Sequence, residues 1–233
     1  MNKVSIIIPC YNESKTIQEI VQRVIAASTG GWEKEIIIVD DASSDGTQQL
    51  LEEFRPYAHI ILRTQNGGKG SGVREGLSHA TGTHVLIQDA DLEYDPEEIE
   101  LLLSHLTETE VDVVYGSRNL RPRERQGALI PRLGVWTITQ LINILHRQKL
   151  TDVWTCYKLF PNESAEDFKP GRFESELLFT TALSRRGYRF AEVPISYHPR
   201  DASEGKKIRY RDGLYAIVVL IWDWILYGDG KGI

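Results

Sequence analysis

Cysteine is scarce in this chain. Among 233 residues there are two, Cys10 and Cys156, and they lie far apart in the sequence. Two such cysteines provide neither a disulfide framework nor the ligand spacing of a metal site, and they favour a reducing cytoplasm. Because Met1–Lys3 runs directly into an apolar stretch, we also expect no signal peptide.

A long apolar run and an excess of basic charge are also missing. The apolar segment at 214–227 is well short of the ~20 residues that span a bilayer. The formal net charge is -6, which gives the chain no overall attraction to nucleic acid. With 41% hydrophobic and 26% charged residues, the composition is that of an ordinary soluble protein, and the length suits one large domain.

What the first half does contain is a repeated alternation of strand-like and helix-like segments. Such repeats predict an α/β fold with a mostly parallel sheet and right-handed crossovers. Asp95 and Pro96 fit an N-cap followed by the first helical position, and Glu98 fits a capping box. Strands are predicted near 4–9, 35–40, 59–63, 84–88 and 112–116, with a helix near 14–27 and others ending near residues 54, 80 and 106.

The second half is less regular, and we see no domain boundary before it. The apolar segment at 214–227 is interrupted only by Asp223, and it carries Trp222, Trp224 and Tyr227. These aromatics suit a membrane interface, whereas the alternative is a helix packed on the domain or on a second subunit. We predict loops at 119–131 and 198–212, helices near 132–147 and 174–186, and strands at 152–160 and 189–195.

Acidic residues follow three of the predicted strands. Pro9–Glu13 ends the first strand, Asp40 and Asp41 end the second, and Asp89–Asp91 ends the fourth. Ligands of open α/β sheets bind beyond the carboxyl ends of the strands, so these clusters predict one site. Asp-x-Asp suits Mg²⁺ or Mn²⁺, because hard cations prefer oxygen ligands, and such a cation would hold a diphosphate. Taken alone, the cluster also fits a solvated acidic loop.

The order of the motifs resembles that of the family 2 inverting glycosyltransferases. It is most similar to the branch that contains dolichyl-phosphate mannose synthases and bacterial polyprenyl-phosphate glycosyltransferases. Each motif is weak alone, whereas the ordered set is specific and covers roughly residues 3–212. The matching segments are Pro9–Glu13, Val39–Thr47, Asn66–Gly70, Asp89–Asp91, Gly116–Arg118, Asp152–Lys158 and Glu192–Ile195.

The resemblance implies a single GT-A domain, which is a Rossmann-like α/β fold with a mostly parallel central sheet flanked by helices. Residues 1–212 would form the catalytic domain, with the nucleotide-sugar half at 1–118 and the acceptor half at 119–212. Residues 213–233 would form an apolar C-terminal helix. The implied reaction moves a sugar from a nucleotide-diphospho-sugar, with inversion and with Mg²⁺ or Mn²⁺. The donor base, GDP or UDP, and the sugar stay open.

The resemblance also assigns residues to the metal and the donor. Asp91 is implied as the direct metal ligand and Asp89 as a neighbour of metal and ribose. Glu93, where the family often has Gln, is a third candidate ligand. Asp41 would hydrogen-bond the nucleobase or ribose. The other residues implied for the donor pocket are Pro9, Tyr11, Glu13, Lys69 and Ala90.

The segment Asn66–Gly70 invites comparison with a phosphate-binding loop. It lacks the Walker spacing, because no Gly-Lys-Ser/Thr follows a first glycine after four residues. We expect a strand-to-helix turn near the nucleotide, with Lys69 facing base or phosphate. Gly67 and Gly68 would supply the tight backbone geometry.

Arginines favour a phosphate acceptor. Arg118 follows the fifth predicted strand, and the resemblance implies phosphate-binding roles for Arg132 and Arg200. Guanidinium forks match phosphate oxygens, and a phosphate monoester is already ionised and needs no base. A hydroxyl acceptor would require a carboxylate base, for which Glu174 and Glu176 are candidates unless they only begin a helix.

We therefore predict transfer to a dolichyl or undecaprenyl phosphate, with transfer to a hydroxyl of a saccharide or other small acceptor as the alternative. The expected location is the cytoplasm, with peripheral contact at the cytoplasmic face of a membrane, and the C-terminal helix is a candidate for subunit contact. A nucleotidyltransferase is disfavoured, because Pro9–Glu13 stands where a glycine-rich loop would follow the first strand. The complete acidic set disfavours an inactive nucleotide-sugar binding module.

Overall fold

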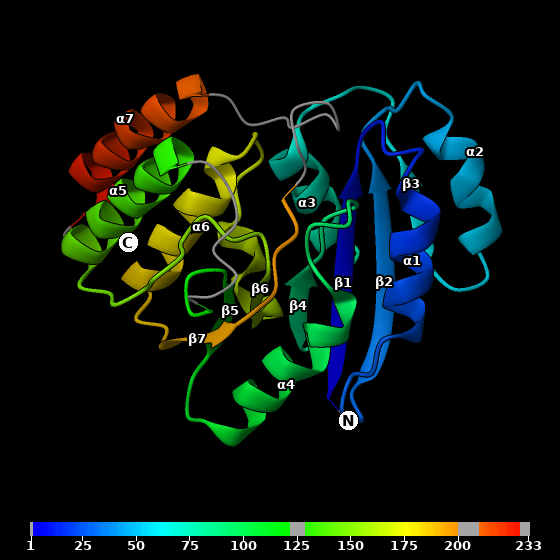
Figure 1. Ribbon diagram of the computed structural model, residues 1–233, viewed down its shortest axis with the longest axis horizontal. Coiled ribbons are helices and arrows are strands. Elements are labelled where there is room, and N and C mark those ends of the chain that lie inside the picture. The colour runs from blue at the N-terminus through cyan, green and yellow to red at the C-terminus, as the bar shows by residue number, and fades with distance from the viewer. Residues whose placement is uncertain (1, 122–128, 200–209, 229–233) are drawn as a thin grey trace.

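A seven-stranded sheet runs through the whole molecule, and helices cover both of its faces (Figure 1). The structure is a computed structural model that describes residues 2–121, 129–199 and 210–228. The strand order is β3-β2-β1-β4-β6-β5-β7, and β6 alone among these strands runs antiparallel to its neighbours. The strands are β1 (Lys3–Cys10), β2 (Glu33–Asp40), β3 (His59–Leu62), β4 (His84–Ile87), β5 (Val113–Ser117), β6 (Lys158–Pro161) and β7 (Phe190–Pro194). This confirms the predicted fold class.

Alternating side chains of β1 divide the core into two layers. Ile6 and Ile8 belong to one apolar cluster and Ile7 to the other, because successive side chains of a strand point to opposite faces. Helices α1, α2 and α4 cover the first face, and α3, α5, α6 and α7 cover the second (Figure 1). The helices are α1 (Ile17–Ala26), α2 (Thr47–Leu51), α3 (Lys69–Leu77), α4 (Ile99–Glu108), α5 (Leu129–His146), α6 (Glu174–Arg185) and α7 (Tyr210–Tyr227), with 3-10 turns at Glu52–Phe54, Pro96–Glu98 and Asn162–Asp167.

The start of the fourth helical region matches the prediction only in part. The Asp95 carboxylate accepts the backbone N–H of Glu97 at 2.9 Å, as expected of an N-cap, and Pro96 takes the first position. The capping box is wrong, because the Glu98 carboxylate accepts the N–H of Ser196 at 2.9 Å instead. Glu98 thus fastens the chain that follows β7 to the start of α4.

The strand predicted at 152–160 is much shorter than expected. β6 contains only Lys158–Pro161. The Tyr157 carbonyl still accepts the Gly116 N–H of β5 at 2.8 Å, but several backbone groups before it bond to side chains. The carbonyls of Val153, at 3.2 Å, and Thr155 accept hydrogen bonds from the buried Lys158 ammonium. The Asp152 carboxylate binds Arg118. Specific polar contacts therefore replace the extended conformation that the apolar pattern favours.

The C-terminal helix α7 packs on α5 and α6 (Figure 1). Ala216 and Leu220 are buried in the second core cluster. The Asp223 carboxylate is held by the Arg185 guanidinium at 2.5 Å and by the Thr181 hydroxyl at 2.8 Å. The one charge that interrupts this apolar segment is thus the group that fixes the helix to α6.

Candidate active site

The carboxyl ends of β1, β2, β4 and β5 lie along one edge of the sheet (Figure 1). Cys10 pairs with Asp40 in the ladder, and the Asp41 N–H donates to the Cys10 carbonyl at 2.8 Å. On the other side of β1, the Gln88 N–H donates to the Ile7 carbonyl at 2.9 Å. The three acidic segments singled out in the sequence therefore meet at one edge.

A threonine hydroxyl joins the loops that follow β1 and β4. Thr16 Oγ1 lies 2.9 Å from the Ala90 carbonyl oxygen and 3.2 Å from Glu13 Oε2. The Glu13 N–H donates to Thr47 Oγ1 at 3.0 Å, which adds the start of α2 to the same contact. The structure thus brings the predicted residues Glu13 and Ala90 together through Thr16, which the sequence did not indicate. Thr47, the last residue of a matched segment, contacts Glu13 alone of these two. Pro9 is buried at the end of β1, and Tyr11 beside it is 38% exposed.

The loop after β4 forms a tight turn around Asp91. Its Oδ1 accepts the Glu93 N–H at 3.0 Å, and only 6% of the residue is exposed. The Glu93 carboxylate accepts the Tyr197 hydroxyl at 3.1 Å, and the Glu93 carbonyl accepts the His198 N–H at 3.0 Å. The turn after β4 is therefore bonded to the chain that follows β7.

Asp41 organises the glycine turn that precedes α3. Its carboxylate accepts the N–H groups of Gly67 at 3.1 Å and Gly68 at 2.7 Å, and it pairs with Arg63. Gly68 has a φ of +88°, and a Cβ there would lie 2.9 Å from Arg172 Cγ, so the turn requires glycine. The sequence did not predict these turn contacts. The predicted contact of Asp41 with the nucleotide stays a prediction.

Lys69 begins α3 and its ammonium faces carboxylates from two other elements. It pairs with Asp89 of the β4 loop and, at 2.9 Å, with Glu176 of α6. The second oxygen of Glu176 lies 3.2 Å from Nζ of Lys158. Burial alone would lower the pKa of Lys69, but Asp89 and Glu176 raise that pKa well above its usual range.

Both glutamates considered as bases for a hydroxyl acceptor are already engaged. Glu176 is 2% exposed and lies between two lysine ammonium groups. The Glu174 carboxylate accepts the Arg172 N–H at 3.2 Å, at the start of α6. The Glu174 contact agrees with the alternative that the sequence left open, a structural role at a helix start. The pairing of Glu176 with two lysines was not predicted.

Arg118 extends from the end of β5 into a fork made by one aspartate. Its Nε and Nη2 donate to the two oxygens of Asp152 at 2.6 and 2.8 Å, and its N–H donates at 3.1 Å. Asp152 is fully buried, and its own N–H donates to Glu192 at 2.9 Å. The guanidinium carbon also lies 5.0 Å from the centre of the Tyr197 ring. The sequence indicated Arg118 but not this partner, although Asp152 lies in a matched motif.

Two of the predicted phosphate-binding arginines cannot be placed at this site. Arg200 lies outside the described residues. Arg132 belongs to α5, but its side chain is outside the described part of the structure. Their roles stay predictions from the resemblance.

The carboxylates after β4 fit a divalent cation that takes its other ligands from a bound diphosphate and from water. Among the described residues, no group of three or more His, Cys, Asp or Glu side chains is arranged to hold a metal ion. Mg²⁺ needs no such cage, since it binds through one or two carboxylates, waters and substrate phosphates. Asp89 and Asp91 supply donors of this kind on one short turn, with the Lys69 ammonium already at Asp89.

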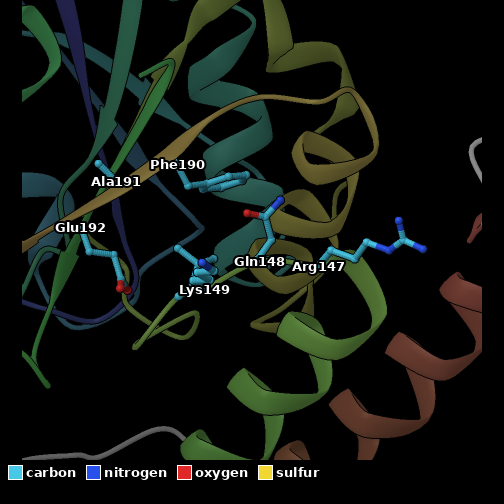
Figure 2. A pocket seen from close by; sticks show the side chains of 7 residues that line it. Arg147, Gln148, Lys149, Phe190, Ala191 and Glu192 are labelled. Carbon is cyan, nitrogen blue, oxygen red and sulfur yellow. The ribbon is translucent and has the colours of Figure 1, made fainter. Parts of the chain in front are cut away.

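A cavity of about 280 Å³ lies between the end of α5 and β7 (Figure 2). Glu192 connects this cavity to the site, because its carboxylate accepts the N–H of Thr151 at 2.7 Å as well as that of Asp152. Figure 2 shows the Arg147 side chain extending away from Glu192. None of the predicted donor residues lines the cavity, whose walls are Arg147, Gln148, Lys149, Leu150, Phe190, Ala191 and Glu192.

Comparison with known proteins identifies the family. Residues 5–168 match the description "Glycosyl transferase family 2". The chain belongs to glycosyl transferase family 2. This confirms the resemblance carried by the ordered motifs, and with it the predicted enzyme class, a nucleotide-sugar-dependent glycosyltransferase.

Two relatives show how far the similarity extends. Glycosyltransferase AglJ of Haloferax volcanii is 29% identical over 214 residues, which cover 90% of this chain and 68% of that protein. The undecaprenyl-phosphate 4-deoxy-4-formamido-L-arabinose transferase of Enterobacter sp. (strain 638) is 38% identical over 142 residues. That match covers 57% of this chain and 43% of the relative, so the chain spans less than half of the Enterobacter protein.

A solved structure shows the same fold. Glucosyl-3-phosphoglycerate synthase from Mycobacterium tuberculosis in complex with UDP superposes with a TM-score of 0.73 at 19% identity, over 95% of this chain and 80% of the synthase. The same synthase with Mn²⁺, UDP and glucosyl-3-phosphoglycerate gives a TM-score of 0.69 at 19% identity, over 94% and 80%. At this identity the likeness establishes the GT-A-like fold alone.

Proposed function

We propose that this chain transfers a sugar from a nucleotide-diphospho-sugar to a polyprenyl phosphate, with inversion and with a divalent cation. The observation that carries the proposal is the meeting of Asp89, Asp91 and Lys69 at the edge where β1, β2 and β4 end. The undecaprenyl-phosphate named for the Enterobacter relative supports the acceptor class. The UDP and Mn²⁺ in complexes of the mycobacterial synthase support the donor and the cation.

In the proposed donor site, charge balance at the diphosphate is the central task. Displacement of a nucleoside diphosphate leaves negative charge on the leaving group, and a bound cation would stabilise it. Asp91 and Asp89 would hold that cation, and Lys69 would add a fixed positive charge. We assign the base and ribose to the part of the site formed by Pro9, Tyr11, Glu13 and Asp41. This part lies next to the glycine turn that Asp41 holds.

On the acceptor side, residues 119–212 would bind the phosphate. A phosphate monoester needs no base, which agrees with the engagement of Glu174 and Glu176 in local contacts. Arg118 would face the phosphate from the end of β5, with Asp152 fixing the plane of its guanidinium. Arg132 and Arg200 complete the proposed set from the resemblance.

A polyprenyl phosphate lies in a membrane, so the enzyme must reach one. No helix among the described residues is both long and apolar enough to cross a bilayer. The outer face of α5 and α7 exposes large apolar side chains, including Trp136 and Trp222 at 59% each and Leu226 at 63%. Aromatic and aliphatic side chains of this kind suit the interfacial region of a bilayer. We therefore propose peripheral membrane contact through this face.

A donor and acceptor screen tests the proposal. UDP- and GDP-sugars are offered with Mn²⁺, and release of nucleoside diphosphate is measured with a short-chain polyprenyl phosphate or with soluble saccharides. We expect release that requires the lipid phosphate and stops when a chelator removes the cation. Turnover with a saccharide hydroxyl, and none with the lipid phosphate for any donor that binds, would replace this acceptor by the hydroxyl alternative.

A further inference from the structure

Four charged side chains of alternating sign form a line from the core to the proposed donor site. The order is Lys158, Glu176, Lys69 and Asp89, and each is paired with the next. Their side-chain exposure rises along the line, from 0% for Lys158 to 3%, 12% and 14%. The members come from β6, α6, α3 and the loop after β4, so the line joins four elements that are distant in sequence.

The inner end of the line is anchored on three sides. The Lys158 ammonium donates to the carbonyl of Val153 at 3.2 Å and to that of Thr155. It also lies 4.9 Å from the centre of the Tyr115 ring. A buried ammonium held in this way fixes the position of the carboxylate that pairs with it, because an unpaired charge at this depth is costly. Glu176 is therefore held between Lys158 and Lys69.

We propose that Glu176 is a positioning residue that acts through Lys69 on the cation site. Anchored by Lys158, it shares the Lys69 ammonium with Asp89, so that Lys69 neutralises Asp89 only in part before a diphosphate arrives. The identity of the ligand rests on the proposed function. Glu176 thus takes part in donor binding without touching the sugar or the acceptor, and it is not a general base.

This arrangement couples the cation to the diphosphate. In the free protein, Lys69 and a divalent cation compete for the same Asp89 carboxylate, since both are positive. A diphosphate gives Lys69 a third anionic partner besides Asp89 and Glu176, so the cation then binds Asp89 against weaker competition from Lys69. Coupling of this kind is reciprocal: the nucleotide must raise the affinity for the cation by the same factor as the cation raises the affinity for the nucleotide.

Titration calorimetry with Mn²⁺ alone, and with Mn²⁺ plus UDP or GDP, measures this coupling. In the parent protein we expect the nucleotide to tighten Mn²⁺ by about tenfold or more. Lys69→Met should bind Mn²⁺ alone about tenfold more tightly and lose most of the coupling. Glu176→Gln should bind Mn²⁺ alone about tenfold more weakly, because Lys69 then pairs with Asp89 alone. Glu174→Gln, two residues away, should behave like the parent.

A second variant separates positioning from folding. Glu176→Gln leaves Lys158 buried without its carboxylate, so Tm should fall by about 10 °C. Adding Lys158→Met removes both charges of the inner pair and should restore much of Tm, while Lys69 still lacks Glu176 and the coupling stays altered. If the double variant regained the parent's coupling together with Tm, Glu176 would be only a structural residue and the inference would be wrong.

The remaining outcomes distinguish this inference from the proposed function. Loss of turnover in Glu176→Gln with unchanged Mn²⁺ and nucleotide binding would make Glu176 a base and overturn the inference. Unchanged Mn²⁺ binding in Lys69→Met would also overturn it, while nucleotide binding by the parent would leave the proposed function standing. If the parent bound Mn²⁺ but neither UDP nor GDP, the proposed donor would be wrong. The Mn²⁺ titrations of the parent and of Lys69→Met would still show whether Lys69 competes with the cation. A parent that bound no Mn²⁺ would have no cation site for Lys69 to control, and the inference would fall.

Discussion

The sheet edge that holds the proposed donor site and the outer face of α5 and α7 are built from opposite kinds of side chain. At the sheet edge, carboxylates lie at low exposure and are fixed by partners from other elements, as Asp41 is by Gly67 and Gly68. Residues 133–146 contain no Asp, Glu, Lys or Arg, and residues 213–228 contain only Asp223. Their exposed side chains are large and apolar instead.

The difference shows how the two surfaces achieve specificity. Fixed charges at low exposure interact strongly, because little water screens them and no reorganisation is needed when a ligand binds. An exposed apolar face has no such directionality, and its stabilisation scales with the area that leaves water. The first surface suits one charged ligand in one orientation, whereas the second suits a surface that is broad and apolar. Changes at the two surfaces should therefore affect different measurements.

The largest effect is expected at the sheet edge, from Asp91→Asn. Losing one carboxylate charge from the proposed cation site should lower kcat/KM by about 10²–10³-fold, because the leaving group then loses part of its charge stabilisation. The nucleoside diphosphate release assay measures this, and Tm checks that the fold survives. Glu97→Gln changes an exposed carboxylate close by and is the matched control. Turnover near the parent's, with no response to a chelator, would remove the cation from the mechanism.

The strands of the first half could be predicted because their signals are local. Apolar runs such as 36–39 and 85–87 identify buried strands, and the residues that follow them must lie at the same sheet edge. The location of Asp41, Asp89 and Asp91 at this edge was predicted in this way, whereas their proposed roles come from the resemblance.

The partners of these residues could not be predicted, because each comes from a distant part of the chain. Asp152 lies 34 positions from Arg118, and Glu176 lies further still from Lys69. Hydrophobic periodicity carries no information about which charges will meet across a sheet. Lys158 is an example, because it is fully buried and nothing in the neighbouring sequence indicates this. Lysine is almost never fully buried unless it is paired.

The next largest effect is expected from Arg118→Lys, at the end of β5 on the same sheet edge. Lysine keeps the charge but cannot make the two parallel bonds to Asp152, so the acceptor phosphate would lose a fixed donor. We expect kcat/KM for the polyprenyl phosphate to fall by about 10–100-fold, while the Kd of the nucleotide stays within a few-fold. Steady-state kinetics and calorimetry separate these quantities. Arg55→Lys, an exposed arginine that pairs with Glu52, is the control. Equal losses in donor and acceptor binding would make Arg118 a structural residue.

A smaller effect is expected at the apolar face, from the pair Trp222→Ser and Trp224→Ser. Removing two interfacial aromatics should weaken sedimentation with anionic liposomes by about tenfold or more, because the buried apolar area decreases. Turnover of a soluble short-chain acceptor should change little. Tyr57→Ser removes an exposed aromatic of the first half, at 64% exposure, and should leave liposome binding unchanged. If the tryptophan variant bound liposomes as the parent does, α7 would not be the membrane contact.

The smallest effect is expected at the amino edge of the sheet, far from both regions, where Glu35 joins β1, β2 and the turn before β4. Its carboxylate accepts hydrogen bonds from the Ser5 hydroxyl at 2.5 Å and the Thr81 N–H at 2.9 Å, and it pairs with Lys3 at 3.0 Å. Partial burial would raise the pKa of Glu35, but these hydrogen bonds lower it to about 2, from 4.5.

A pKa that is lowered in the folded state defines the direction of the pH dependence. Glu35 binds its proton more readily when the chain is unfolded, so its contribution is complete above pH 4.5 and is lost as the pH falls toward about 2. Glu35→Gln should therefore lower Tm by a few degrees near neutral pH, and the difference from the parent should shrink in acid. Glu33→Gln, whose carboxylate is 59% exposed and lies 3.7 Å from Lys3, should show almost no such difference. A Tm difference that stayed constant from neutral pH to about pH 2 would mean that Glu35 contributes by packing and hydrogen-bond shape rather than by its charge.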